Sequence, residues 1–220
     1  MQPNPAESLP LPRRLALSYA PRSARDSVLT LMLLDERLAT ILRQKGEVMI
    51  AQVKLAWWRD RLAEDKSRWP AGEPLLDRLR EGALDATALV PLVDGWERLL
   101  GDALTISAIE EFAAGRASAW CAVATAHDAA GTHDADAIAR TARQYSLADL
   151  AMHLDDAEER RAALELARVG RWSRARLPRC VRPLAVLHAL AGRALDRGGA
   201  ELLDGPGAVT LALRTGLFGR

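Results

Sequence analysis

The block from residue 17 to residue 62 constrains the fold most, because it carries two helical patterns joined by a short break. The first pattern predicts a helix over 23–44. It has one apolar face interrupted by a single acid, and its members recur every three to four residues: Val28, Leu31, Asp35, Leu38 and Leu42. Gly46 marks the break, and a second helix is predicted over 47–63. Two long helices in succession indicate a helical protein.

The second of these helices is predicted to be apolar on two opposite faces. One face holds Val48, Ala51, Leu55, Trp58 and Leu62, and the other holds Ile50, Val53 and Trp57. Such a helix is expected to be sandwiched inside a protein rather than to lie on its surface. Polar stripes run between the two faces, and one of them contains Gln52 and Arg59. Because buried charges need partners, at least one of the polar stripes is expected to face a cavity or a charge network.

The rest of the chain also indicates an all-α fold, since no stretch shows the alternation typical of strands. Ser107 and Glu110 have the spacing of a capping box and predict the start of a helix that continues to about residue 127. Further helices are predicted over 75–82, 86–102, 135–154, 157–168 and 182–196, with a short one at the end of the chain.

Length and composition favour one domain over residues 1–220, with a flexible stretch over 1–14 and a Gly-rich loop over 197–208. The 30 basic and 29 acidic side chains leave a net charge of +1, so no nucleic-acid partner is predicted. Cys121 and Cys180 lack metal-ligand or disulfide spacing. With neither a signal peptide nor a run of apolar residues long enough to span a membrane, the chain is predicted to be cytoplasmic.

Three features of the first 60 residues resemble the squalene/phytoene synthase family. The motif Tyr19-Ala20-Pro21 is followed by Arg22 and Arg25, then by an apolar helix, and the next helix ends in Trp57-Trp58-Arg59. The resemblance implies an isoprenoid synthase-like helical bundle around a central cavity. It also implies lipid substrates, so peripheral contact with the inner face of a membrane is a further expectation.

Enzymes of that family use two Asp-rich helices whose carboxylates, at i and i+4, bind Mg²⁺ and the diphosphate of the substrate. In this chain Asp35 has Ala39 four residues later. In the second motif, His153 takes the place of the first aspartate and Ala157 follows four residues on. The resemblance is therefore to a shortened member that lacks the Asp-rich motifs, and neither catalytic residues nor metal ligands are predicted.

The acidic run 155–159 looks like the metal-binding motif of prenyl transferases, but its position favours the first turn of a new helix. Asp149 is a candidate buried acid, and His153 is its candidate partner. Arg116 shares a stripe with Phe112 and Trp120 and is expected to meet an acid inside the protein. The small residues of 113–119 are read as helix packing, with pocket lining as the alternative. His127, His133 and His188 lack ligand spacing and are expected at the surface or in caps.

The candidate pocket residues are therefore Asp35, Gln52, Arg59, Asp149 and His153. The resemblance adds Arg22 and Arg25 as candidate phosphate contacts. The predicted function is that of a degenerate squalene/phytoene synthase-like protein without prenyl transfer activity, which binds an isoprenoid or lipid or acts as an assembly factor on a protein partner. The alternative is an active prenyltransferase that condenses prenyl diphosphates head to head. No cofactor is predicted, and Mg²⁺ enters only with that alternative.

Overall fold

Helices form the whole architecture in the computed structural model, which describes residues 4–44, 47–101, 103–129, 132–170, 172, 176–198 and 201–219. Within these ranges there are ten α-helices and no strand. The α-helices are α1 (Leu11–Leu17), α2 (Arg22–Arg43), α3 (Val48–Ala63), α4 (Pro74–Glu81), α5 (Val90–Glu97), α6 (Ile106–Thr125), α7 (Thr132–Ala151), α8 (Ala157–Arg168), α9 (Arg182–Asp196) and α10 (Pro206–Phe218). The all-α prediction is confirmed. The predicted break at Gly46 and the side chain of His133 lie outside the described residues.

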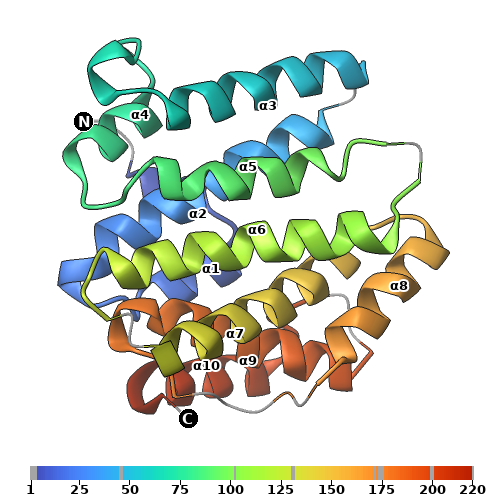
Figure 1. The fold of residues 1–220 in the computed structure, drawn as a ribbon. Helices are drawn as coiled ribbons and strands as arrows, with labels where there is room; N and C mark the ends of the chain where they lie inside the picture. Colours follow the sequence, from blue (N-terminus) through green and yellow to red (C-terminus); the bar gives the residue numbers. More distant parts are fainter. Residues whose placement is uncertain are drawn as a thin grey trace.

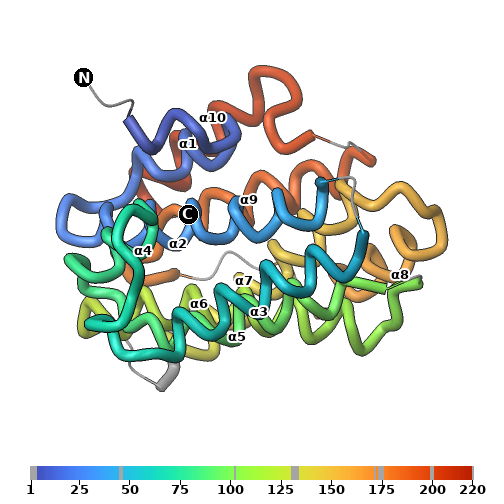
Figure 2. The backbone as a smooth tube through the Cα atoms, turned by 90° about the horizontal axis from the view of Figure 1, so that it is seen from above, coloured from blue at the N-terminus to red at the C-terminus, as the bar shows by residue number. Residues whose placement is uncertain are grey.

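Helices that follow one another along the chain also pack against one another in space. Helix α5 packs on α6, α6 on α7, α7 on α8 and α9, and α9 on α10. Helix α2 contacts α1, α3, α4, α5 and α6, so it forms the centre of the first half of the chain. Figure 1 shows α3 and α4 at one end of the bundle and α9 and α10 at the other, and Figure 2 shows α1 beside α10.

A connected core of buried apolar side chains receives a contribution from each of the ten α-helices. On α2 the predicted face is buried up to Leu38 and partly buried at Leu42, and Asp35 lies in the middle of it, between Leu31 and Leu38. Burial of this face stabilises α2 as a helix, since tertiary packing rather than intrinsic propensity stabilises most protein helices. The same packing carries Asp35 into the centre of the protein.

Helix α3 differs from its prediction, because only one of its apolar faces is covered. Leu55, Trp58 and Leu62 are buried. The opposite face is open to solvent, with Ile50 50%, Val53 65% and Trp57 38% exposed. Figure 1 shows why: α3 lies at the edge of the bundle, and α5 and α2 lie on one side of it only. The helix is therefore at the surface and is not sandwiched.

The start of the chain also differs from its prediction. Residues 5–8 form a 3₁₀ turn and residues 11–17 form α1, although 1–14 was expected to be flexible. Helix α1 begins with two prolines among its first positions, Pro10 and Pro12, where the missing N–H donors cost nothing because the first N–H groups of a helix lack intrahelical partners. The helix packs on α2, α9 and α10. It thereby brings Arg13 to the centre of the bundle.

Helix α6 begins two residues before the predicted capping box. Its N-cap is Thr105, whose side chain accepts a hydrogen bond from the N–H of Ala108, while Ser107 donates to Glu111. In the middle of α6, Gly115 lies so close to the backbone of Pro91 on α5 that a Cβ atom there would overlap the Pro91 carbonyl oxygen. The small residues of 113–119 therefore serve helix packing, as predicted.

Candidate functional site

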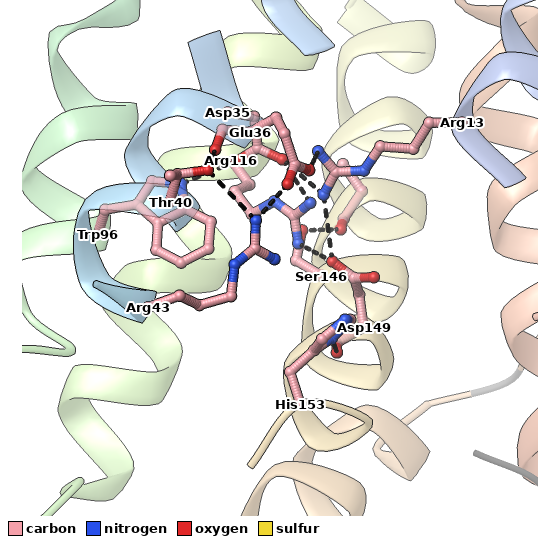
Figure 3. Close-up of polar contacts among 11 residues, drawn as sticks. Arg13, Asp35, Glu36, Thr40, Arg43, Trp96, Arg116, Ser146, Asp149 and His153 are labelled. Carbon is pink, nitrogen blue, oxygen red and sulfur yellow. Dashed lines mark hydrogen bonds and ion pairs between the residues drawn. The ribbon is translucent and has the colours of Figure 1, made fainter. Parts of the chain in front are cut away.

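Four charged side chains from four helices meet at the centre of the bundle. Arg116 of α6 donates to both acids, with 2.6 Å from Nη2 to Asp35 Oδ2 and 2.8 Å from Nη1 to Asp149 Oδ2. Arg13 of α1 approaches the same two oxygens, at 3.0 Å from Asp35 and 3.5 Å from Asp149. Figure 3 shows the two carboxylates facing each other across the two guanidinium groups. We call these four residues the central network.

The surroundings of the central network are aromatic. Trp96 donates from Nε1 to Asp35 Oδ1 at 2.8 Å, so both oxygens of this carboxylate accept hydrogen bonds. The guanidinium carbon of Arg116 lies 5.4 Å from the centroid of the Phe112 ring and 5.2 Å from that of Tyr145. At such distances a cation is attracted by the faces of aromatic rings. The rings also exclude water, which strengthens the ion pairs inside them.

Burial and pairing act against each other on the ionisation of these groups. Burial alone would raise the pKa of Asp149, but Arg116 and Arg13 outweigh it and hold this pKa below its ordinary value. Burial likewise opposes the charge on Arg116, yet Asp35 and Asp149 raise its pKa above the ordinary value. Burial and the nearby Asp149 raise the pKa of Tyr145 to about 12, so its hydroxyl stays protonated at neutral pH. The central network therefore carries two positive and two negative charges, which compensate one another.

A second acid of α2 extends the central network toward solvent. Glu36 lies 3.4 Å from Arg13, measured from Oε2 to Nη1, and it also pairs with Arg43, about two turns further along α2. Figure 3 shows Arg43 and Thr40 beside Glu36 on the same helix. The acids and arginines thus continue from the core to the rim of a groove.

The groove has a volume of about 1410 Å³ and lies where the C-terminal parts of α2, α5 and α7 meet the first turns of α1, α6 and α8. Arg13 and Asp149 of the central network form part of its lining, together with Tyr145. Apolar side chains make up much of its wall: Leu11, Leu42, Trp96, Leu99, Leu100, Leu104, Ile106, Phe112, Leu150, Met152, Leu154, Leu202 and Leu203. A groove of this size can hold a drug-sized or longer apolar molecule.

Acids outnumber arginines around the groove. The lining contains three arginines, Arg13, Arg43 and Arg161, and eight acids, Glu36, Asp149, Asp155, Asp156, Glu158, Glu159, Glu165 and Glu201. Two of the acids in the run 155–159 bind the backbone: Asp156 is the N-cap of α8, and Glu159 accepts from the N–H of Leu104 at 2.8 Å. The run therefore forms the first turn of a helix, as its position predicted, and acids are stabilised there by the helix dipole.

The residues present do not fit a pair of magnesium-binding carboxylates. Within the described ranges no group of three or more His, Cys, Asp or Glu side chains is arranged to hold a metal ion. Asp35 and Asp149 already give their Oδ2 atoms to Arg116, which occupies the space between them. The free volume beside Asp35, Arg116 and Tyr145 is about 10 Å³, which is room for one water molecule at most.

The structure brings together three of the five candidate pocket residues. Asp35 and Asp149 belong to the central network, and His153 lines the groove with its Nδ1 2.7 Å from the backbone oxygen of Asp149. His153 thus contacts the backbone of its predicted partner, while the carboxylate of Asp149 binds the arginines. Gln52 and Arg59 lie elsewhere: Gln52 is exposed, and Arg59 pairs with Asp94 and Glu97 of α5 outside the groove.

Arg22 and Arg25, the candidate phosphate contacts, also lie away from the groove lining. Arg22 is exposed, and Arg25 donates to the backbone oxygen of Leu17 at 2.9 Å. His188, expected at the surface or in a cap, is buried and contacts Gln144 through Nε2 at 2.9 Å. Arg13 was missed altogether, although its place in a helix that begins with Pro10 and Pro12 is a signal that could have indicated an ordered segment.

Comparisons with known proteins found no relative of this chain: the models of protein families, the curated proteins and the solved structures gave no match.

Proposed function

We propose that this chain is a squalene/phytoene synthase-like protein that lacks prenyl transfer activity and binds an isoprenoid or another apolar chain in the groove. The proposal includes the finer fold prediction, an isoprenoid synthase-like bundle around a central cavity. The observation that carries it is the central network: one acid from each of the two helices that would bear the Asp-rich motifs is present, and Arg116 lies between them.

The proposed lack of prenyl transfer follows from how Asp35 and Asp149 are engaged, since both carboxylates are paired with arginines. Magnesium needs free carboxylate oxygens in a site that also admits phosphates and water. Here the shared guanidinium groups supply the positive charge instead, and they hold it in a space too small for a diphosphate. The same feature weighs against the alternative, a head-to-head prenyltransferase.

The charge of the groove supports an uncharged ligand. With eight acids against three arginines in the lining, a diphosphate without metal would be repelled. The apolar wall matches a hydrocarbon chain. Among the lining residues, Tyr145 has a buried hydroxyl without a hydrogen-bond partner in the described part of the chain, and an oxygen at the head of a ligand would satisfy it. We therefore expect a prenyl alcohol or a lipid of similar polarity to bind more tightly than a prenyl diphosphate.

A role as an assembly factor is the second candidate, and the open face of α3 favours it. Met49, Ile50, Val53 and Trp57 form an apolar surface patch on one side of that helix. Contiguous exposed apolar patches commonly mark protein interfaces. In this alternative the chain would bind a protein partner through α3, and the groove would remain empty.

Thermal unfolding with farnesol, and with farnesyl diphosphate in the presence and absence of Mg²⁺, tests the proposal. At 100 times its dissociation constant a ligand adds about 2.7 kcal/mol, which for a chain of this length raises Tm by roughly 5–10 °C. We expect this rise with farnesol and no Mg²⁺-dependent rise with the diphosphate. Met152→Glu, which places a charge in the groove, should abolish the rise, and Val53→Glu on α3 is the matched control.

The outcomes separate the candidate functions. A Mg²⁺-dependent rise with farnesyl diphosphate would contradict the loss of prenyl transfer, and release of diphosphate would then be measured. No rise with either compound would contradict the groove as a lipid site and would favour the second candidate, binding of a protein partner through α3.

A further inference from the structure

The C-terminal helix α10 exposes most of its apolar side chains. Val209 is 57%, Leu213 50%, Leu217 61% and Phe218 68% exposed. The first three are four residues apart and therefore share one face of the helix. The buried residues of α10 are small, Ala208, Ala212 and Thr215, and the helix packs on α9 and α1. The large apolar side chains on the outer face of α10 therefore do not stabilise the fold by burial.

The loop before α9, together with α9 itself, is strongly basic. Residues 166–195 contain seven arginines and no aspartate or glutamate, although the whole chain has a net charge of only +1. Arg176 and Arg179 are exposed and lie close enough to Arg182 to lower its pKa, after the larger effect of burial. Within the described residues none of these three arginines pairs with a carboxylate.

The basic group and the apolar face meet at the end of α10. The guanidinium of Arg182 lies against Gly219, so closely that a Cβ atom on this glycine would overlap it. Gly219 follows Leu217 and Phe218 directly, and Arg214 is exposed on the same helix, which carries no acid. An apolar stripe with arginines beside it is therefore formed at the end of the bundle that holds α9 and α10 (Figure 1).

This combination selects among occupants. A nucleic acid would use the arginines but would leave Leu213, Leu217 and Phe218 in water. The open face of α3, at the opposite end of the bundle, has charges of both signs around it, Glu47, Lys54 and Asp60, and so lacks such a preference. A layer of anionic phospholipids matches both parts, because apolar side chains enter the acyl boundary while arginines contact the phosphates.

We propose that α10, together with Arg176, Arg179 and Arg182, binds the surface of a membrane that contains anionic phospholipids. The helix would lie parallel to that surface with Val209, Leu213 and Leu217 inserted. None of the described helices is both long and apolar enough to cross a bilayer. The inference is independent of the ligand of the groove, since no residue of α10 lines it.

Co-sedimentation with vesicles tests the proposal. Vesicles of phosphatidylcholine alone are compared with vesicles of phosphatidylcholine and phosphatidylglycerol in equal parts, at low and high salt. We expect binding to the second kind that weakens with salt, because the attraction is screened. Arg176→Gln with Arg179→Gln should weaken binding roughly 30-fold. Leu213→Ser with Leu217→Ser should weaken it at least tenfold, at about 0.8 kcal/mol for each methylene withdrawn from the lipid.

Both double variants change exposed side chains, so we expect their Tm to be unchanged. Measuring the Tm verifies that the variants are folded before their binding is compared. Met49→Ser with Val53→Ser on α3 is the matched control and should bind like the original chain. The proposal is overturned if the original chain does not sediment with the anionic vesicles, if it binds both kinds of vesicle equally, or if the α3 variant loses as much binding as the α10 variant. The first of these results would direct attention to an acidic protein surface as the occupant.

Discussion

The central network and the ion pairs of α3 both contain a charged residue of a long helix with apolar faces, but the two charged residues lie in opposite surroundings. Asp35 interrupts the apolar face of α2, whereas Arg59 lies on a polar stripe between the two apolar faces of α3. The side chain of Asp35 is 8% exposed and is enclosed by arginines and aromatic rings, whereas the side chain of Arg59 is 33% exposed and that of its partner Asp94 49%. The comparison teaches that a polar residue in an apolar helix marks a site only if other elements cover that face.

The largest expected effect comes from removing a charge from the central network. Arg116→Met leaves Asp35 and Asp149 buried with only Arg13 to compensate them, and such a change should cost about 3–5 kcal/mol of unfolding free energy. Urea unfolding at neutral pH measures the loss. Arg116→Lys, which keeps the charge but loses the fork of donors, should recover part of it. A loss below about 1 kcal/mol for the methionine variant would show that the central network behaves like a surface pair.

A smaller effect is expected from a buried polar residue that stays neutral. Burial lowers the pKa of His188 to about 4, whereas an unfolded histidine has an ordinary value of about 6.5. The unfolded chain therefore binds more protons in this window. The stabilising contribution is complete above about pH 6.5 and falls by about 3 kcal/mol as the pH drops toward 4.

His188→Gln removes this titration, so its unfolding free energy, measured by urea at several pH values, should decline less over the same window. Gln144, which contacts His188, can still serve the glutamine as a partner. An identical decline in both proteins would mean that His188 is accessible to protons when folded. His188 would then titrate like an exposed group despite its buried position.

The smallest effect is expected on α3. Arg59→Met breaks the pairs with Asp94 and Glu97, and because water screens these partly exposed charges the change should cost less than about 1 kcal/mol. The same urea unfolding measures it, and raising the salt concentration should reduce the cost further. A cost as large as that of Arg116→Met would remove the distinction between the two regions.

Much of the fold was predictable because helices are encoded locally. The bounds of α8 and α9 agree with the sequence periodicity, and those of α2 and α3 differ by one residue at each changed end. The partner of Arg116 was also predictable in kind, since a charge between Phe112 and Trp120 needs an acid. These properties depend on neighbours within a few turns of one helix.

The rest depended on contacts between distant elements, which local periodicity does not contain. The second apolar face of α3 has the same sequence periodicity as a buried face. It is exposed because the helix lies at the edge of the bundle. Arg13 lies in a Pro-rich stretch that resembles a flexible terminus until α1 packs on α2 and α9. Three of the four residues of the central network, the two acids and Arg116, were therefore singled out from the sequence, and Arg13 was not.

The wide sequence separation within the central network has a consequence for how the chain folds. Arg116 and Asp149 lie 33 residues apart, but Arg116 and Asp35 lie 81 apart. Helices α6 and α7 are joined by a short loop and can pair early, and Arg116 would then be half compensated until α1 and α2 arrive. Because contacts between distant residues form slowly, we expect closure of the central network to be a late step in refolding.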